Sequence, residues 1–324
     1  MALSTMDIPE PAQTARPSAS LPQPLRGMIP PMVSPLLDDD TLDVAGLERL
    51  VEYILAGGVH GLFVLGSTGE GPSLGSRVRR ELVAHVCRQV NGRVPVLVGI
   101  TDNSLAESLA LANFAAVAGA QAVVCTTPSY FPAGDAELLH FFKSLNSRLP
   151  LPLLLYNMPA LTGISFSMEL VRALMAEENV VGLKDSSGDL NYFQAVREVA
   201  ADRPDWTLMV GPERLLADAV ALGADGGVSG GANVHPRLLV DLHESAAAGD
   251  SERLAGVKSR LAQLAKLYQL QPGDGGPPIA ALKFALSCLK VCDDRVAPPL
   301  LPLDRSHRAA VEQILDGLGL RNSN

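Results

Sequence analysis

Residues 95–126 read PVLVGITDNSLAESLALANFAAVAGAQAVVCT, and this stretch decides the fold. It contains two apolar runs, Pro95–Ile100 and Ala122–Thr126, separated by the amphipathic segment Leu105–Ala118. Apolar strands that alternate with helices are typical of a parallel sheet whose outer face is covered by those helices. The stretch therefore predicts one strand–helix–strand unit of an α/β protein.

The same unit recurs along the chain. The predicted strands are Met28–Val33, Gly61–Leu65, Pro95–Ile100, Ala122–Thr126, Pro152–Tyr156, Val180–Lys184, Thr207–Val210 and Gly226–Ser229. Eight strands of this kind favour a closed (β/α)₈ barrel, the TIM barrel, over an open sheet. No GxGxxG sequence follows the first run, which argues against a dinucleotide-binding fold.

The chain is expected to divide into three parts. Residues 1–24 are rich in Pro, Ser and Ala and predict a disordered tail, residues 25–249 form the catalytic barrel, and residues 250–324 form a small C-terminal helical appendage. The appendage is predicted from three helical patterns separated by Pro- and Gly-rich breakers. These patterns are Ser251–Leu270, Ile279–Lys290 and Asp304–Leu315.

Composition narrows the classes of partner. Of the 324 residues, 47% are hydrophobic and 19% are charged, so a large core can form, and the net charge is −9. A negative surface repels phosphate backbones and anionic lipids, so we expect no nucleic acid and no membrane partner. No apolar run reaches the roughly 18 residues of a membrane helix, and no basic start precedes an apolar run as in a secretory signal. The expected compartment is the cytoplasm.

Neither a metal site nor a disulfide is predicted. The four cysteines contain no CxxC pair, and the six histidines contain no HExxH spacing. Cys288 and Cys292 are four residues apart on a helical pattern, so we expect them on one helix face. Buried, reduced cysteines are the expectation for all four.

Lys184 ends the apolar run Val180–Leu183, although a lysine is rarely buried without a partner. Its position alone leaves two alternatives open. The ammonium could reach water or pair with Asp185, or a lysine held away from water could be a nucleophile that forms an imine with a carbonyl carbon.

Other polar side chains also end strands, where TIM barrels carry their chemistry. Tyr156 ends the strand before that of Lys184, and Tyr130 closely follows another strand. A phenol can pass a proton or hydrogen-bond a carboxylate. Ser67 and Thr68 lie between glycines, where exposed backbone N–H groups can hold a carboxylate, although an ordinary capped turn is the alternative.

Five motifs at strand ends carry a resemblance. They are GSTGE at 66–70, TPSYFP at 127–132, YNMPALTG at 156–163, GLKDSSGDL at 182–190 and GADGGVSGGAN at 223–233. Together they resemble the dihydrodipicolinate synthase and N-acetylneuraminate lyase family of class I aldolases, from about residue 25 to the C-terminus.

The resemblance implies roles for the catalytic residues. Lys184 would form the Schiff base with pyruvate or a related 2-oxo acid, and Tyr156 would shuttle protons. Ser67 would be the relay hydroxyl, and Thr68 would bind the carboxylate of the oxo acid. Tyr130 would be lent across a subunit interface, which implies a homodimer or homotetramer.

The resemblance also implies a substrate-binding set, and no cofactor is required for this chemistry. Val228 and Gly211 match positions whose backbone lines the pocket. Ser186 belongs to a segment similar to that of sugar-acid aldolases, and Glu213 stands where relatives bind sugar hydroxyls. The chemistry would be cleavage of a 4-hydroxy-2-oxo acid into pyruvate and an aldehyde, or the reverse.

The identity of the aldehyde partner stays open. Dihydrodipicolinate synthases usually carry an arginine that grips the carboxylate of aspartate semialdehyde, and this chain has Leu161 there. A 2-keto-3-deoxy sugar acid or a 4-hydroxy-2-oxoglutarate-type substrate is therefore preferred. 4-Hydroxy-tetrahydrodipicolinate synthase is the enzymatic alternative, and a non-catalytic barrel that senses a 2-oxo acid is the alternative of another class.

Overall fold

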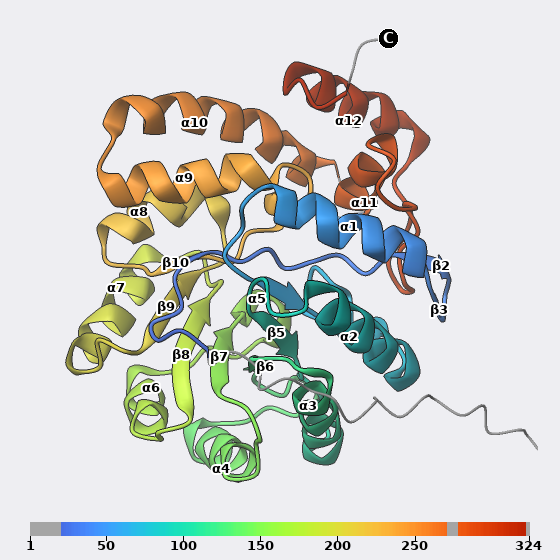
Figure 1. Ribbon diagram of the computed structural model, residues 1–324. Helices are drawn as coiled ribbons and strands as arrows, with labels where there is room; N and C mark the ends of the chain where they lie inside the picture. The colour runs from blue at the N-terminus through green and yellow to red at the C-terminus, as the bar shows by residue number, and fades with distance from the viewer. Residues whose placement is uncertain (1–20, 271–277, 322–324) are drawn as a thin grey trace, which may run out of the picture.

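The computed structural model describes residues 21–270 and 278–321 (Figure 1). Its centre is a sheet of eight strands, all parallel, in the order β1-β10-β9-β8-β7-β6-β5-β4. The strands are β1 Gly27–Met28, β4 Leu62–Val64, β5 Val96–Gly99, β6 Ala122–Thr126, β7 Leu153–Asn157, β8 Val180–Asp185, β9 Thr207–Val210 and β10 Gly226–Gly227. All eight strands are buried along their whole length, as a sheet covered by helices requires.

The sheet closes on itself into the predicted TIM barrel. The segment after β1 pairs with β4 through a parallel bridge between Pro31 and Phe63. The amide of Met32 donates to Phe63 O at 2.8 Å, and the amide of Phe63 donates to Pro30 O at 2.9 Å. The first and last strands of the order are therefore neighbours, which confirms the closed barrel.

The interior of the barrel is a separate apolar cluster. It contains Leu21, Leu25, Ile29, Phe63, Leu97, Ala122, Val124, Leu154, Tyr156, Val181, Met209 and Val228. Leu25 N donates to Thr207 Oγ1 at 2.8 Å, and Thr207 opens β9, so the segment around Leu25 packs at the amino ends of the strands. Leu21, inside the expected tail 1–24, is only 9% exposed, while residues 1–20 lie outside the described residues.

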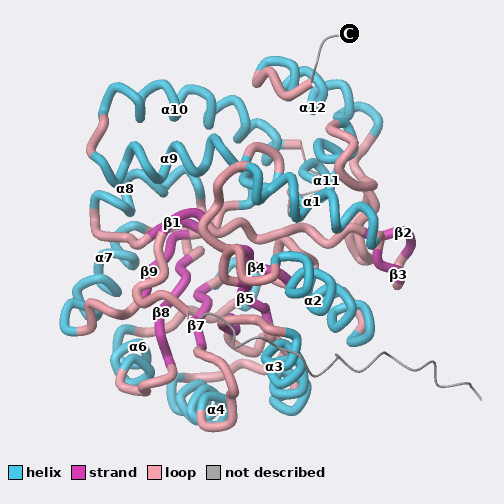
Figure 2. Tube along the Cα trace, viewed as in Figure 1, coloured by secondary structure: helices cyan, strands magenta, loops and turns pink. Residues whose placement is uncertain are grey.

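Helices surround the sheet, as Figure 2 shows. Those of the barrel are α1 Val44–Ala56, α2 Ser76–Val90, α3 Leu105–Ala118, α4 Asp135–Asn146, α5 Pro159–Thr162, α6 Met168–Met175, α7 Leu190–Val199, α8 Leu216–Ala221 and α9 Pro236–Ala248. Local sequence sets their ends: Ser104 accepts the amide of Glu107 at the start of α3, and Gly119 ends it with φ +97°.

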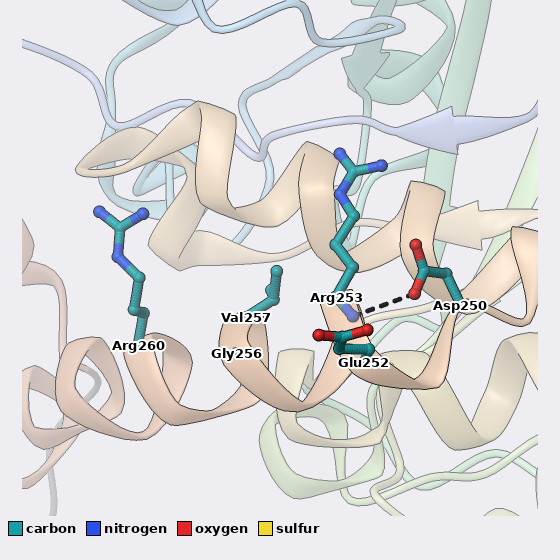
Figure 3. A pocket seen from close by; sticks show the side chains of 6 residues that line it. All are labelled: Asp250, Glu252, Arg253, Gly256, Val257 and Arg260. Carbon is teal, nitrogen blue, oxygen red and sulfur yellow. Dashed lines mark hydrogen bonds between the residues drawn. The ribbon is translucent and has the colours of Figure 1, made fainter.

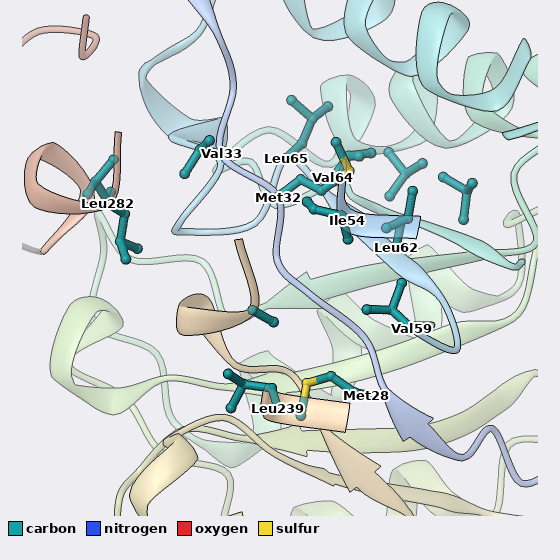
Figure 4. Close-up of a cluster of buried hydrophobic side chains, with 14 of the residues drawn as sticks. Met28, Met32, Val33, Ile54, Val59, Leu62, Val64, Leu65, Leu239 and Leu282 are labelled. Atoms are coloured by element: carbon teal, nitrogen blue, oxygen red, sulfur yellow. The ribbon is translucent and has the colours of Figure 1, made fainter. Parts of the chain in front are cut away.

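The C-terminal residues form further helices against one side of the barrel. They are α10 Ser251–Leu264, α11 Ile279–Cys288 and α12 Arg305–Gly317, with a 3₁₀ turn, η5 Ala265–Gln269, after α10. The pattern predicted one helix over Ser251–Leu270, but the α-helix ends at Leu264. Figure 4 draws Leu282 of α11 in the same buried cluster as Val33 and Leu65 of the barrel, so barrel and appendage share a core.

Two local features differ from the expectation. An antiparallel pair, β2 Leu36–Asp38 with β3 Thr41–Leu42, lies outside the barrel sheet and was not predicted. The expectation that Cys288 and Cys292 share a helix face is wrong, because α11 ends at Cys288 and Lys290 turns the chain with φ +59°. All four cysteines are free thiols, and only Cys288 is not fully buried.

Within residues 21–270 and 278–321, no helix is both long and apolar enough to cross a lipid bilayer. The same residues contain no group of three or more His, Cys, Asp or Glu side chains arranged to hold a metal ion.

Candidate active site

Two neighbouring strands bring the central pair of residues together. In the parallel pairing of β7 with β8, Tyr156 is the register partner of Lys184, and Asn157 is the partner of Asp185. Tyr156 and Lys184 are each 5% exposed at the carboxyl ends of their strands. The strand ends thus place a phenol and an ammonium side by side at the end of the barrel that carries chemistry in this fold.

The Lys184 ammonium faces aromatic rings. Its Nζ lies 3.8 Å from the centroid of the Tyr156 ring and 5.1 Å from that of Phe63, both within cation–π range. Among the described residues, no carboxylate lies within ion-pair distance of Lys184. With no carboxylate partner in the described part of the chain, the nitrogen stays available to a bound molecule.

Asp185 is hydrogen-bonded to other groups, which argues against its predicted pairing with Lys184. Its carboxylate accepts from Asn157 Nδ2 at 2.8 Å, from Ser187 N at 3.0 Å and from Ser187 Oγ at 2.9 Å. Successive side chains of a strand point to opposite faces, so Asp185 turns away from the barrel interior. Asn157 Oδ1 in turn accepts from Phe166 N at 3.2 Å. Asp185 thus forms its bonds with Asn157 and Ser187 and not with Lys184.

The Tyr156 hydroxyl is surrounded by groups that favour its ionised form. It lies 3.4 Å from Ser67 Oγ. Burial alone would raise the pKa of this phenol, but the charge of Lys184 and hydrogen bonds from Ser67, Lys184 and Ser186 outweigh burial and lower the pKa below its usual value. A phenol of this kind gives and takes protons more readily at neutral pH than an isolated one.

Ser67 and Thr68 are held by a tight turn after β4. The amide of Glu70 donates to Ser67 O at 3.0 Å, and that of Gly71 donates to Gly66 O at 3.2 Å. A Cβ on Gly66 would lie 2.5 Å from the Phe63 ring, and one on Gly69 would lie 2.7 Å from Met32 O. The glycines of the motif are therefore required by close packing, which fixes the two hydroxyls.

Three of the predicted pocket residues lie near Lys184 and Tyr156. A Cβ on Gly211 would lie 2.0 Å from Ser186 Oγ, so the loop after β9 packs directly on the loop after β8. Val228 belongs to the same interior cluster as Tyr156. The structure thus brings Ser186, Gly211 and Val228 to the region of Lys184 and Tyr156.

Glu213 is placed differently from a simple sugar-binding side chain. It is 6% exposed, and its Oε2 accepts from Gly231 N at 3.0 Å and from Tyr268 OH at 2.9 Å. Burial raises the pKa of this carboxyl to about 7. Its predicted role in substrate binding stays a prediction, since these donors of the chain already occupy one carboxylate oxygen.

The pH dependence of stability is expected to report on Glu213. The folded pKa of about 7 exceeds the ordinary 4.5, so the folded state holds a proton that the unfolded state has released. The contribution of this group is full below pH 4.5 and falls as pH rises through 7, by up to about 3 kcal/mol. Glu213→Gln should flatten this dependence in thermal unfolding between about pH 5 and pH 8. An unchanged slope would contradict the assignment.

Tyr130 is not brought to the other site residues within one chain. It is 76% exposed, and its ring meets that of Phe131, itself 75% exposed, at 5.0 Å and nearly perpendicular. The backbone is nevertheless fixed, because Asn103 Oδ1 accepts from the amides of Ser129 at 3.0 Å and Tyr130 at 3.1 Å. The exposed Tyr130 ring is therefore carried on a backbone that Asn103 holds in place.

Sequence reasoning missed two contributors to the site. Phe63 was seen only as part of an apolar strand; alternation along β4 could have placed it inside the barrel, but not its contact with Lys184. Glu70 was noted only as the last residue of the GSTGE motif, and its ion pair with Lys283 of α11 was not predicted. No local signal links these two residues.

A surface depression lies on α10, apart from the strand ends (Figure 3). Its lining residues are Asp250, Glu252, Arg253, Gly256, Val257 and Arg260. Asp250 caps the helix by accepting the amide of Arg253 at 3.0 Å. The lining comes from one helix and its cap and includes none of the predicted catalytic residues.

Known proteins are similar to this chain in sequence and in fold. A model of the dihydrodipicolinate synthetase family matches residues 24–318. A putative 2-dehydro-3-deoxy-D-gluconate aldolase of Escherichia coli, YagE, is 32% identical over 91% of this chain and 97% of its own length. A dihydrodipicolinate synthase structure from Bacteroides thetaiotaomicron superposes with TM-score 0.87 at 45% identity, covering 91% of this chain and 99% of that one. The structure of YagE in complex with pyruvate gives TM-score 0.86 at 31% identity, covering 91% and 99%.

Proposed function

Because the chain belongs to the dihydrodipicolinate synthetase family, we propose that Lys184 forms the imine through which it breaks or makes a carbon–carbon bond. The reaction class comes with the family: the chain is a Schiff-base-forming lyase of class I, an aldolase acting on pyruvate and a 4-hydroxy-2-oxo acid. The assignment of roles to individual side chains is our proposal.

One observation carries the proposal. Lys184 Nζ is buried at a strand end, has no carboxylate partner among the described residues, and lies 3.8 Å from the ring of a phenol with lowered pKa. A structural lysine at such a site would be expected to pair with a buried acid. A nucleophile instead needs an unblocked nitrogen and a nearby group that accepts and returns protons.

Imine formation uses the residues around Lys184. The 2-oxo acid binds with its carboxylate at the Thr68 turn, and Lys184 attacks C2 as the neutral amine. Tyr156 carries a proton to the carbinolamine oxygen, with Ser67 as its relay, so that the oxygen leaves as water. The resulting iminium draws electrons from C3.

Cleavage then follows from the iminium. Tyr156, as phenolate, removes the proton of the C4 hydroxyl, the C3–C4 bond breaks, and its electron pair moves into the iminium to give an enamine and an aldehyde. Protonation of C3 by the Tyr156 phenol restores the imine, and water releases pyruvate and free Lys184. Condensation is the same sequence reversed.

The preferred substrate is a 2-keto-3-deoxy sugar acid or another 4-hydroxy-2-oxo acid. YagE, a putative 2-dehydro-3-deoxy-D-gluconate aldolase whose structure holds pyruvate, supports this choice. Leu161, 56% exposed on α5, offers no charge to the carboxylate of aspartate semialdehyde, which disfavours 4-hydroxy-tetrahydrodipicolinate synthesis. Ser186 and Glu213 belong to the proposed pocket for the sugar-acid hydroxyls.

The active assembly is a homodimer or homotetramer in which Tyr130 enters the site of a neighbouring subunit. The support is the exposed Tyr130–Phe131 pair, since large aromatic side chains that cluster on a surface mark an interface. Sedimentation velocity of the full chain gives the assembly. The proposed compartment is the cytoplasm, which four free cysteines support.

Borohydride trapping tests the reaction class on this chain. The protein is incubated with pyruvate, reduced, and analysed by intact mass and peptide mapping, and we expect a single pyruvyl adduct on Lys184. Retro-aldol assays with 2-keto-3-deoxy sugar acids are then compared with condensation of pyruvate and aspartate semialdehyde. An adduct on a different lysine would refute the assignment. Pyruvate binding without any adduct would favour the non-catalytic sensor.

A further inference from the structure

A fully buried ion pair joins the catalytic turn to the C-terminal appendage. Glu70 Oε2 pairs with Lys283 Nζ of α11, and both side chains are 0% exposed. The remaining bonds of the two groups are also internal: Lys283 Nζ donates to Arg295 O at 2.6 Å, and Glu70 Oε1 accepts from Ala297 N at 2.6 Å. Two groups of the appendage, Lys283 of α11 and the amide of Ala297, thus bind the side chain of Glu70.

Stability alone does not account for this pair. Removing two charges from water costs more than their attraction commonly returns, so two apolar residues of similar size would hold the same elements together at least as well. What an ion pair with two further hydrogen bonds adds is direction, because each bond fixes an atom within a narrow range of distance and angle. The pair therefore specifies where Glu70 lies.

The backbone of the turn links the position of Glu70 directly to that of Ser67 in the site. Glu70 has φ +55°, in the left-handed region that residues other than glycine adopt rarely, so the turn is held in a conformation that needs support. Its amide donates to Ser67 O at 3.0 Å, and Ser34 Oγ donates to Gly69 O at 2.6 Å. A shift of Glu70 thus moves Ser67.

The hydrogen bond between Ser67 and Tyr156 tolerates little movement of Ser67. Ser67 Oγ lies 3.4 Å from Tyr156 OH, at the outer limit of a hydrogen bond. An outward movement of a few tenths of an ångström would break it, since interactions of this kind weaken steeply beyond that distance.

Building on the proposed function, we propose that the Glu70–Lys283 pair is a positioning device through which the C-terminal appendage sets Ser67 against Tyr156. Glu70 and Lys283 touch neither substrate nor reacting atoms. They act on the proton relay through the turn, so α11 helps to position the relay without taking part in the chemistry.

A double-mutant cycle on turnover tests the route of the effect. Glu70→Gln keeps the size of the side chain and its acceptor for Ala297 N but removes the charge. We expect it to lower kcat about tenfold in the parent and less than about twofold in a Ser67→Ala background, because both changes break the same contact. Equal factors in the two backgrounds would overturn the proposal, since a general loss of structure does not depend on Ser67.

A second readout does not require activity. Burial raises the pKa of Tyr53 to about 12, and burial also raises the pKa of Tyr192 and Tyr268, whereas that of Tyr156 is lowered. We therefore expect Tyr156 to ionise before these three phenols in alkaline difference spectra of tyrosinate. Glu70→Gln should move this first transition to higher pH, because Ser67 no longer stabilises the phenolate.

The matched control is the ion pair of Arg321 with Glu312, 2.9 Å long, which lies in the same appendage. Glu312→Gln should leave both kcat and the first tyrosinate transition unchanged. The variant Glu70→Gln/Lys283→Met, in which no unpaired charge remains, should regain parental stability and keep the shifted transition. An unshifted transition in both Glu70 variants would refute the positioning role. Loss of pyruvate trapping in the parent, with the spectral shift present, would refute only the proposed function.

Discussion

Replacing Lys184 by Ala should abolish turnover, lowering kcat by at least about 10³-fold, because no other amine in the site can form the imine. Stability should stay equal or rise, since the variant removes an ammonium that is 5% exposed and has no carboxylate partner among the described residues. Pyruvate release in a coupled assay measures the first expectation, and thermal unfolding measures the second. Borohydride with pyruvate should leave the variant without added mass.

Lys258→Ala is the control, since this lysine is about half exposed and pairs with Asp218 on the surface. It should retain parental activity and the adduct. Near-normal turnover in Lys184→Ala would refute the imine mechanism. A destabilised variant would instead mean that the ammonium holds the barrel mouth together.

Tyr156→Phe should lower kcat about 10²- to 10³-fold while changing the KM for pyruvate little. The ring stays, so its packing against Phe63 at 6.4 Å and its contact with Lys184 at 3.8 Å persist, and only the proton-carrying hydroxyl is lost. Steady-state kinetics and the rate of borohydride trapping measure the effect, which should appear in imine formation itself.

The control removes a partly buried phenol away from the site. Tyr53 donates to Val234 O at 2.6 Å, and Tyr53→Phe should cost stability but leave kcat unchanged. If Tyr156→Phe keeps parental kcat, another group shuttles the proton. Ser67→Ala, which deletes only the relay, should lie between the two variants in kcat.

Much of the barrel could be predicted because the sequence within each strand or helix determines that element. The predicted strands Ala122–Thr126 and Thr207–Val210 coincide with β6 and β9, and the predicted helix Leu105–Ala118 coincides with α3. Apolar runs, caps and glycines act within a few residues, so their consequences are visible in the sequence. The short strands β1 and β10 were predicted too long, because pairing with neighbours and not composition ends them.

Lys184 and Tyr156 were predicted for the same reason, since each ends an apolar run and consecutive parallel strands share an edge. Two things were not visible: that Asp185 faces Asn157 and Ser187, and that Phe63 lies against the ammonium. The neighbours of a side chain at a strand end depend on how the barrel closes. No single stretch of sequence contains this information.

The sequence by itself determined the (β/α)₈ barrel, the appendage helices and the strand ends that carry Lys184, Tyr156 and Ser67, because hydrophobic period and turn chemistry are local properties. Only the tertiary structure decided that no acid among residues 21–270 and 278–321 pairs with Lys184, that Glu213 accepts a hydrogen bond from Tyr268, and that Glu70 pairs with Lys283. Those contacts join residues far apart in the chain. Burial, which sets their energies and pKa values, exists only once the chain has closed around them.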